Sequence, residues 1–190
     1  LTDDCKPSRE VQLGFCGRVL LNAFNEVEWG EANNDKQLVE MGHSIIESFM
    51  QNGFTDAGYF IDFVNFNHGM PKSKDVVHSI RQQSEAVYAM LHYLKYERQH
   101  GRQHKEWEKK MRTVLDNFLT LQKADGSFAR KYNDNGDDID ASGGSTPSAT
   151  STLVMGWKYF GDKRYLAAAK RTVDYVERNI ISKSDYFSST

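Results

Sequence analysis

Cysteine is scarce in this chain of 190 residues, which contains only Cys5 and Cys16. Two cysteines are too few for a disulfide framework, and their spacing does not match that of a zinc site. Buried or incidental thiols are the simplest interpretation, and a Cys5–Cys16 disulfide is the alternative. The sequence is therefore not that of a small domain held together by several disulfides or by zinc.

Long apolar runs and runs of like charge are also missing. The longest apolar stretches fall well short of the roughly 20 residues that cross a bilayer, so no membrane span is expected. The 24 basic and 26 acidic residues nearly balance and are interspersed, which argues against nucleic acid as a partner. The chain begins at Leu1 rather than Met, so we expect a trimmed part of a longer precursor and suspect a periplasmic or extracellular location.

Helical periodicity of two alternating kinds is what the sequence has in abundance. Three segments are apolar or small in nearly every direction around a helix, as in helices buried on most sides, namely residues 11–29, 80–96 and 148–160. Three others place their apolar side chains on one stripe, namely residues 38–49, 107–118 and 165–180. We therefore predict an all-α fold, a single domain over residues 1–190 in which three helical hairpins, with about six main helices, form an inner and an outer layer.

Glycine, aspartate and proline mark the ends of these helices. Gly30, Gly101 and Gly161 fall between inner and outer helices, at intervals of 71 and 60 residues, where each is expected to end a helix in the left-handed conformation. Asp35 and Asp162 are expected to cap two outer helices. Thr146, followed by proline, is expected to cap the third inner helix. The intervals indicate a helical repeat longer than common short solenoid units.

The connections from each outer helix to the next inner helix are long, about residues 52–78 and 122–146. Because successive hairpins run parallel, both loops are expected at the same end, beside the N-termini of the inner helices. Loops of this length commonly carry binding or catalytic residues. This end is therefore where a functional site is expected.

Two short motifs accompany this helix pattern. Gln122-Lys-Ala-Asp-Gly-Ser-Phe128 closes one outer helix, and Gly161-Asp-Lys-Arg-Tyr165 opens the next. Together they resemble part of an (α/α)-toroid of the six-hairpin glycosidase-like group, in which six hairpins close a ring. The group includes hydrolases and lyases that bind poly- or oligosaccharides at the end with the long loops, so the resemblance implies a carbohydrate substrate, and we expect no cofactor.

Three hairpins are only half of such a ring. The chain therefore looks like part of a truncated (α/α)6 barrel, in which the open sides of the half-ring would expose apolar surface. We expect the missing remainder of the toroid, or self-association of the chain, to cover them.

The second long loop is rich in aspartate. Glycoside hydrolysis requires two carboxyl groups, one that protonates the leaving oxygen and one that activates water or attacks the sugar. Asp137 and Asp138 are the candidate catalytic residues. A substrate or ion contact and a plain solvated loop are the alternatives, because Asp, Asn and Gly are also the residues of turns. The EF-hand pattern is absent, and no metal site is predicted.

Substrate-binding candidates come from both loops and from the second inner helix. The first loop offers Tyr59, Asp62 and His68, a mixture of aromatic and polar groups suited to sugar rings, and the second offers Tyr132. The first loop could equally contain a short strand packed on the helices, and His68 could be either a base in a lyase-type elimination or a surface residue.

Arg81 and Glu85 lie one turn apart at the start of the second inner helix. They would lie at the mouth of a pocket, although a structural ion pair explains them equally well.

These observations favour a carbohydrate-active protein, with glycoside hydrolase as the leading function. A helical domain that binds a glycan or a protein without catalysis is the first alternative, and a polysaccharide lyase is the second. A terpenoid-cyclase-like toroid is disfavoured because the sequence has no Asp-rich cluster inside a helix.

Overall fold

The computed structural model describes residues 10–12, 16–61, 63–65 and 77–183. Among the predicted site residues, Asp62 and His68 lie outside the described residues.

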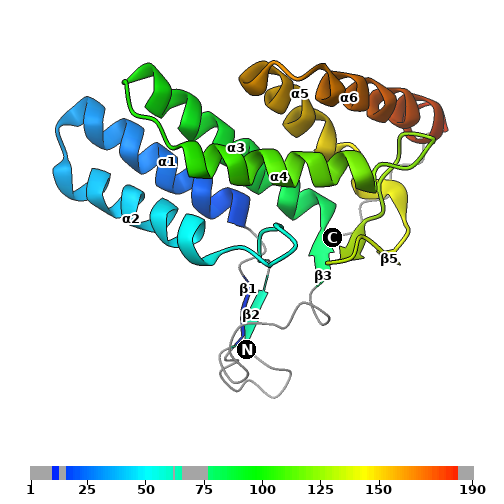
Figure 1. The fold of residues 1–190 in the computed structure, drawn as a ribbon, viewed down its shortest axis with the longest axis horizontal. Coiled ribbons are helices and arrows are strands. Elements are labelled where there is room, and N and C mark those ends of the chain that lie inside the picture. Colours follow the sequence, from blue (N-terminus) through cyan, green and yellow to red (C-terminus); the bar gives the residue numbers. More distant parts are fainter. Residues whose placement is uncertain (1–9, 13–15, 62, 66–76, 184–190) are drawn as a thin grey trace.

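In the described part the chain forms three helical hairpins (Figure 1): α1 (Cys16–Asn33) with α2 (Lys36–Asn52), α3 (Ile80–Gln99) with α4 (Lys105–Leu121), and α5 (Ser148–Phe160) with α6 (Lys163–Val176). A π-helical turn, Glu177–Ile181, extends α6. The predicted all-α architecture of three hairpins is confirmed.

The first helix of each hairpin belongs to the inner layer. Helix α3 contacts α1 on one side and α5 on the other, while α2 packs on α1 and α6 on α5. Helix α4 covers α3 and also contacts α5 and α6. The core between the layers is built from aliphatic and aromatic side chains that are almost fully buried, including Val27, Ile46, Met90, Leu94, Leu115, Phe118, Leu153 and Tyr165.

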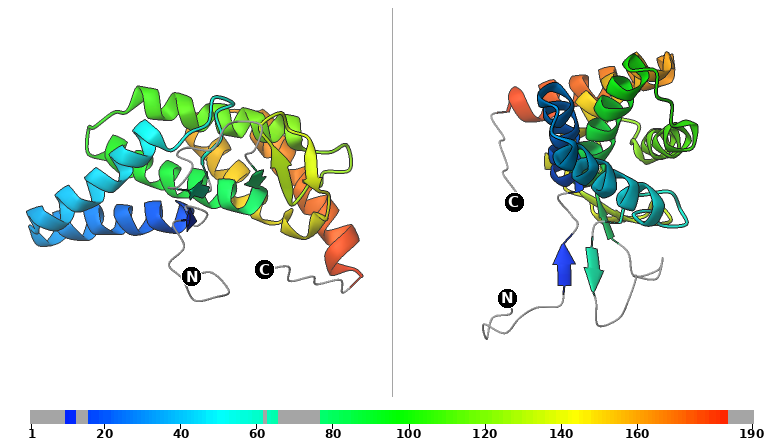
Figure 2. Two further views of the ribbon diagram at one scale, coloured as in Figure 1. Left: turned by 90° about the horizontal axis from the view of Figure 1, so that it is seen from below. Right: turned by 90° about the vertical axis from the view of Figure 1, so that its left-hand side faces the viewer.

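The first inner helix begins later than the apolar pattern predicts. Residues Glu10–Gln12 form a short strand, β1, which pairs antiparallel with β2 (Phe63–Asn65), and the two strands lie apart from the helical layers (Figure 2). The predicted start of this helix at residue 11 is therefore wrong. An apolar residue such as Val11 fits a strand as well as a helix, and its backbone pairs with Val64.

Helix ends follow the sequence prediction at some positions and not at others. Gly101 and Gly161 have the predicted positive φ angles, 77° and 74°. Gly30 instead lies inside α1, where a Cβ would come within 2.8 Å of Val39 Cγ2, and Asn34 adopts the left-handed conformation with φ of 58°. The predicted role of Gly30 as a helix end is therefore wrong, because close packing of α1 on α2 requires the glycine.

The two aspartate caps are confirmed. Asp35 accepts a hydrogen bond from the Leu38 amide at 3.1 Å, and Asp162 accepts one from the Arg164 amide at 2.9 Å. The predicted cap at Thr146 is wrong, because the Thr146 hydroxyl forms hydrogen bonds with the backbone of Phe128 and not with the first turn of α5. Thr146 therefore fastens the second long loop to the core.

A small sheet joins the two long loops. Strand β3 (Val77–Ser79) pairs antiparallel with β4 (Lys131–Asn133), which pairs antiparallel with β5 (Asp138–Asp140). Because β3 leads directly into α3, the sheet holds the second loop against the N-terminus of the central inner helix. The two long loops thus meet at one end of the helical layers (Figure 1).

The Gln122–Phe128 motif forms a turn that ties α4 to α6. The Gln122 side-chain amide donates to the Ala168 carbonyl and to Thr172 Oγ1, both at 2.9 Å. Asp125 Oδ1 accepts hydrogen bonds from the amide and the hydroxyl of Ser127 at 2.9 and 2.7 Å. The motif therefore has a structural task in this chain.

In the part of the chain that the structure describes, none of the helices combines the length and apolar character required of a bilayer-spanning segment.

Candidate functional site

Four side chains from both long loops form a buried group, here called the loop-end cluster: Tyr59, His78, Tyr132 and Asp134. The Tyr59 ring lies 4.7 Å from the His78 ring and 5.2 Å from the Tyr132 ring, centre to centre. His78 Nε2 lies 2.7 Å from Asp134 Oδ1, which also accepts a hydrogen bond from Thr55 at 3.0 Å. The sheet positions this group, because His78 on β3 lies opposite Tyr132 on β4.

Burial dominates the electrostatics of the loop-end cluster. It lowers the pKa of His78 below its ordinary value, although the hydrogen bond and the negative charge of Asp134 act in the opposite direction. Burial, together with the charge of Asp134, raises the pKa of Tyr59 to about 12. His78 and Tyr59 are therefore both uncharged near neutral pH, and the imidazole N–H donates to the carboxylate.

The other oxygen of Asp134 is an exception in this packed group. The Asp134 side chain is only 7% exposed, and its Oδ2 is buried without a hydrogen-bond partner in the described part of the chain. A buried carboxylate oxygen that lacks a partner carries a desolvation cost and calls for an explanation by strain or by a ligand. Among the described acidic residues of the two loops, Asp134 is the one with a buried oxygen that lacks a partner.

The lowered pKa of His78 predicts a pH dependence of stability. In the unfolded chain the histidine takes up a proton near pH 6.5, whereas the folded chain takes it up only at lower pH, so stability falls as the pH decreases through that range. Urea unfolding at pH 7 and pH 5 should show a smaller decrease for His78→Gln than for the wild type. An unchanged decrease would contradict this contribution. His92→Gln is the comparison variant. The pKa of His92 is also lowered, by burial and then by Lys95, so this variant should likewise show a smaller decrease than the wild type.

A second group of polar side chains lies on α3 itself. Arg81, Glu85, Tyr88 and His92 recur at intervals of four, three and four residues and are all at least partly exposed. The other residues of this helix between positions 83 and 94 are buried. We call this stripe the inner face. Because α1 and α5 flank α3 and α4 covers it, the inner face points away from the outer layer.

Two pairs organise the inner face. Arg81 Nε donates to Glu85 Oε1 at 2.9 Å, which is the structural ion pair that the sequence offered as the alternative to a pocket. The rings of Tyr88 and His92 lie 4.5 Å apart. Burial, followed by the charge of Lys95, lowers the pKa of His92, so this histidine is neutral near pH 7 and able to accept a proton.

Asp137 and Asp138, the predicted catalytic pair, are exposed: Asp137 ends the turn after β4, and Asp138 is the first residue of β5. Asp137 Oδ2 accepts a hydrogen bond from Asn133 at 3.0 Å, and Asp138 forms an ion pair with Lys123 at 2.7 Å. In the described residues, no hydrogen bond or ion pair joins either aspartate to Arg81 or Glu85. Their catalytic role stays a prediction.

The structure therefore brings together Tyr59 with Tyr132, and Arg81 with Glu85, but it buries the two tyrosine rings. Tyr59 is 5% exposed and Tyr132 1% exposed, so neither presents a free ring face to a ligand in this conformation. Sequence reasoning missed His78, Tyr88 and His92 as members of these groups. The helical spacing from Arg81 and Glu85 would have found Tyr88 and His92, whereas His78 is brought to Asp134 only by strand pairing.

Comparison of the sequence with protein-family models and with curated proteins finds no match. Solved structures do match. Cellobiose 2-epimerase from Bacillus thermoamylovorans matches with a TM-score of 0.67 and 19% identity over 84% of this chain and 40% of its own. A possible GH105 family member from Salmonella enterica matches with a TM-score of 0.70 and 12% identity, over 90% and 45%.

Unsaturated glucuronyl hydrolase from Bacillus sp. GL1 matches with a TM-score of 0.68 and 13% identity, over 94% of this chain and 49% of its own. The chain thus spans less than half the length of each of these proteins. At such low identities the matches establish the arrangement of helices and nothing finer. The chain has the fold of the six-hairpin glycosidase-like (α/α)-toroids over about half of the ring.

Proposed function

We propose that this protein acts on a carbohydrate and that its reaction is the hydrolysis of a glycosidic bond. The observation that carries the proposal is the inner face, in which charged, aromatic and imidazole groups line one side of a largely buried inner helix, in a fold shared with sugar-acting enzymes. Arg81 and Glu85 offer hydrogen bonds to sugar hydroxyls, and the Tyr88 ring offers an apolar surface to a pyranose. The structural neighbours include a cellobiose 2-epimerase and an unsaturated glucuronyl hydrolase, which supports a saccharide ligand.

Within this proposal the carboxylates have separate tasks. Asp137 and Asp138 are the candidates for the acid and for the base or nucleophile, since hydrolysis needs both. Tyr59, Tyr132, Asp62 and His68 are proposed to contribute to substrate binding from the loops. For the two tyrosines this requires the loop-end cluster to open, because both rings are packed against His78.

Asparagine variants test the catalytic pair. The protein should release reducing ends from one or more members of a panel of oligo- and polysaccharides, and Asp137→Asn or Asp138→Asn should reduce kcat by about 100-fold or more. Asp174→Asn, which alters an exposed carboxylate on α6, is the matched control and should leave the rate unchanged. Full activity of both loop variants would remove Asp137 and Asp138 from the catalytic machinery. In that case Glu85 and Asp134 become the carboxylates to test.

Sugar epimerisation or isomerisation is the second candidate function. The observation that favours it is His92, a partly buried neutral imidazole beside Tyr88, because such a base can remove a proton next to a carbonyl carbon. Product analysis by NMR distinguishes the reactions, since an epimerase changes a free sugar without cleaving a bond. A polysaccharide lyase would create an unsaturated product with ultraviolet absorbance, and a binding domain would retain the glycan unchanged.

We also propose that a partner covers the apolar side of the third hairpin. The groove between α5 and α6 exposes apolar side chains such as Val154, Leu166 and Val173, at the side where a further hairpin would pack in a complete ring. Further hairpins of the toroid or a second copy of the chain are the proposed occupants.

A further inference from the structure

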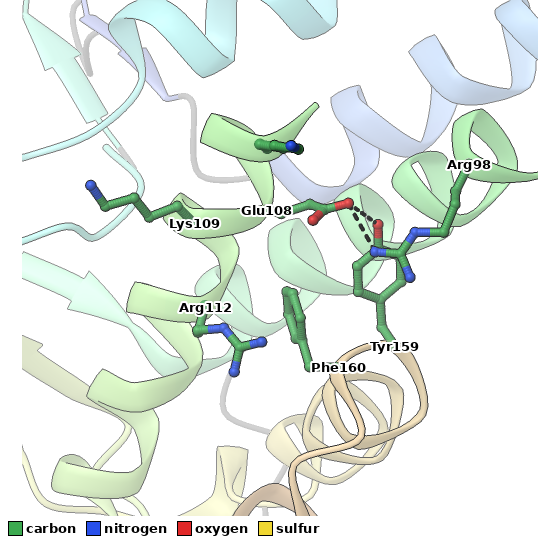
Figure 3. A pocket seen from close by; sticks show the side chains of 7 residues that line it. Arg98, Glu108, Lys109, Arg112, Tyr159 and Phe160 are labelled. Atoms are coloured by element: carbon green, nitrogen blue, oxygen red, sulfur yellow. Dashed lines mark hydrogen bonds and ion pairs between the residues drawn. The ribbon is translucent and has the colours of Figure 1, made fainter. Parts of the chain in front are cut away.

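A pocket lies at the end of the helical layers opposite to the long loops, where the inner helices end. It has a volume of about 400 Å³ and lies between the C-terminal ends of α3 and α5 and the first turns of α4 (Figure 3). Four basic side chains line it, namely Arg98, Lys105, Lys109 and Arg112. A single acid, Glu108, and the rings of Tyr159 and Phe160 complete the lining.

The single acid does not neutralise this basic pocket. Glu108 Oε1 lies 2.9 Å from Arg98 and accepts a hydrogen bond from the Tyr159 hydroxyl at 2.8 Å, so its charge is matched by Arg98 alone. In the part of the chain that the structure describes, Lys105 and Lys109 form no ion pair. The pocket therefore concentrates positive charge on a chain whose formal net charge is −2.

Two arginines are held in place by aromatic rings. The Arg98 guanidinium lies 4.2 Å from the centre of the Tyr159 ring, and the Arg112 guanidinium lies 4.3 Å from that of Phe160. The nearest carboxylate oxygen to Arg112, on Asp162, is 3.9 Å away, beyond hydrogen-bond distance. The Phe160 ring therefore holds the Arg112 guanidinium by one face while its N–H groups stay available for an oxyanion, to which arginine can bind in a bidentate way.

Helix ends do not explain this basic pocket. The N-terminus of α4 brings a positive partial charge to the pocket, whereas the C-termini of α3 and α5 bring negative ones, so the helix ends together add no positive charge. The C-terminus of α5 is also closed by Gly161, whose amide bonds to the Trp157 carbonyl at 2.8 Å. The excess positive charge thus resides in the side chains.

We propose that this pocket binds a small phosphate or sulfate monoester, separately from the proposed carbohydrate site at the long-loop end. Lys105, Lys109 and Arg112 would contact the oxyanion, and Tyr159 and Phe160 would pack against its organic part. The volume falls in the range of small-molecule sites and is larger than a bare phosphate requires. The proposal stands or falls independently of the glycosidic reaction.

Calorimetric titration with glucose 6-phosphate and glucose 6-sulfate tests this proposal. At low ionic strength both esters should bind with a Kd of about 1 mM or lower. Glucose should show no binding with a Kd in that range. Arg112→Gln and Lys109→Gln should each weaken binding about tenfold, because each removes a charged hydrogen-bond donor. Binding should also weaken as sodium chloride is added, because the ligand is held by its charge.

Lys163→Gln is the matched control, since Lys163 is an exposed lysine on α6 outside the pocket. It should bind like the wild type, and melting temperatures should show that all variants are folded. Equal binding of glucose and its esters, or unchanged affinity in Arg112→Gln, would overturn the proposal. Inorganic phosphate that binds as tightly as glucose 6-phosphate would overturn the role of the organic part.

Discussion

Replacing Glu97 by alanine is expected to lower the free energy of unfolding by about 3 kcal/mol, as is typical when one partner of a buried ion pair is removed. Glu97 is 1% exposed and accepts hydrogen bonds from Arg102 Nε and His104 Nε2, both at 2.8 Å. These contacts join the end of α3 to the start of α4. We place the expected loss at the lower end of the range because Arg102 and His104 are partly exposed, and water can solvate them in the variant.

Acid should weaken this contribution of Glu97. Burial alone would raise the pKa of Glu97, but the hydrogen bonds from Arg102 and His104 leave it below its usual value of 4.5. Its stabilising effect is therefore complete above that value and is lost as the pH falls through the folded-state pKa. The difference in the free energy of unfolding between the wild type and Glu97→Ala should therefore become smaller as the pH is lowered.

Urea unfolding at pH 7 measures the effect, with Asp174→Ala as the control. Asp174 pairs with Arg178 on the surface of the last helical segment, with 3.8 Å between nitrogen and oxygen and a side chain that is 57% exposed. Removing such a pair should change the stability by about 0.5 kcal/mol or less. Similar losses in the two variants would show that the buried position of Glu97 adds nothing.

The substitution Gly126→Ala is expected to destabilise the fold by about 3 kcal/mol or more, the sum of a backbone cost and a steric cost. Gly126 has a φ angle of 94°, and a Cβ at this position would lie 2.2 Å from the carbonyl oxygen of Arg171. A backbone atom of α6 cannot move aside as a flexible side chain can. The turn that Gln122 fastens to α6 would therefore have to open.

Gly101→Ala separates the two costs. Gly101 has a φ angle of 77°, but a Cβ there would meet no atom within 4 Å. This variant should lose only the backbone cost of about 1 to 2 kcal/mol. Equal losses in the two variants would contradict the proposed clash at Gly126. Hydrogen exchange should also increase in residues 122–128 of Gly126→Ala and stay unchanged there in Gly101→Ala.

The Gln122–Phe128 motif illustrates how a family resemblance can reflect structure more than chemistry. Its side chains bond to α6 and to its own backbone, so it fixes the angle between the second and third hairpins. A sequence pattern of this kind indicates the architecture reliably, because helix packing imposes the same demand in many proteins. It carries no information about the reaction.

The sequence by itself determined the three helical hairpins of this protein. Helical periodicity and caps are local properties, set by neighbours within one or two turns, so the alternation of buried and amphipathic helices predicted three hairpins, and Asp35 and Asp162 predicted two caps. The span of α5 follows from its small and apolar residues in the same way. The start of α1 was mispredicted because Val11 pairs with a distant strand.

Only the tertiary structure decided which polar side chains meet. The pair of His78 and Asp134 joins residues 56 positions apart, and the hydrogen bond from Thr55 to Asp134 joins residues 79 apart. Such contacts depend on strand register and on the rotation of packed helices, which no local pattern specifies. For the same reason the basic pocket between α4 and α5 could not be foreseen, since its arginines and aromatic rings come from separate hairpins that only packing brings together.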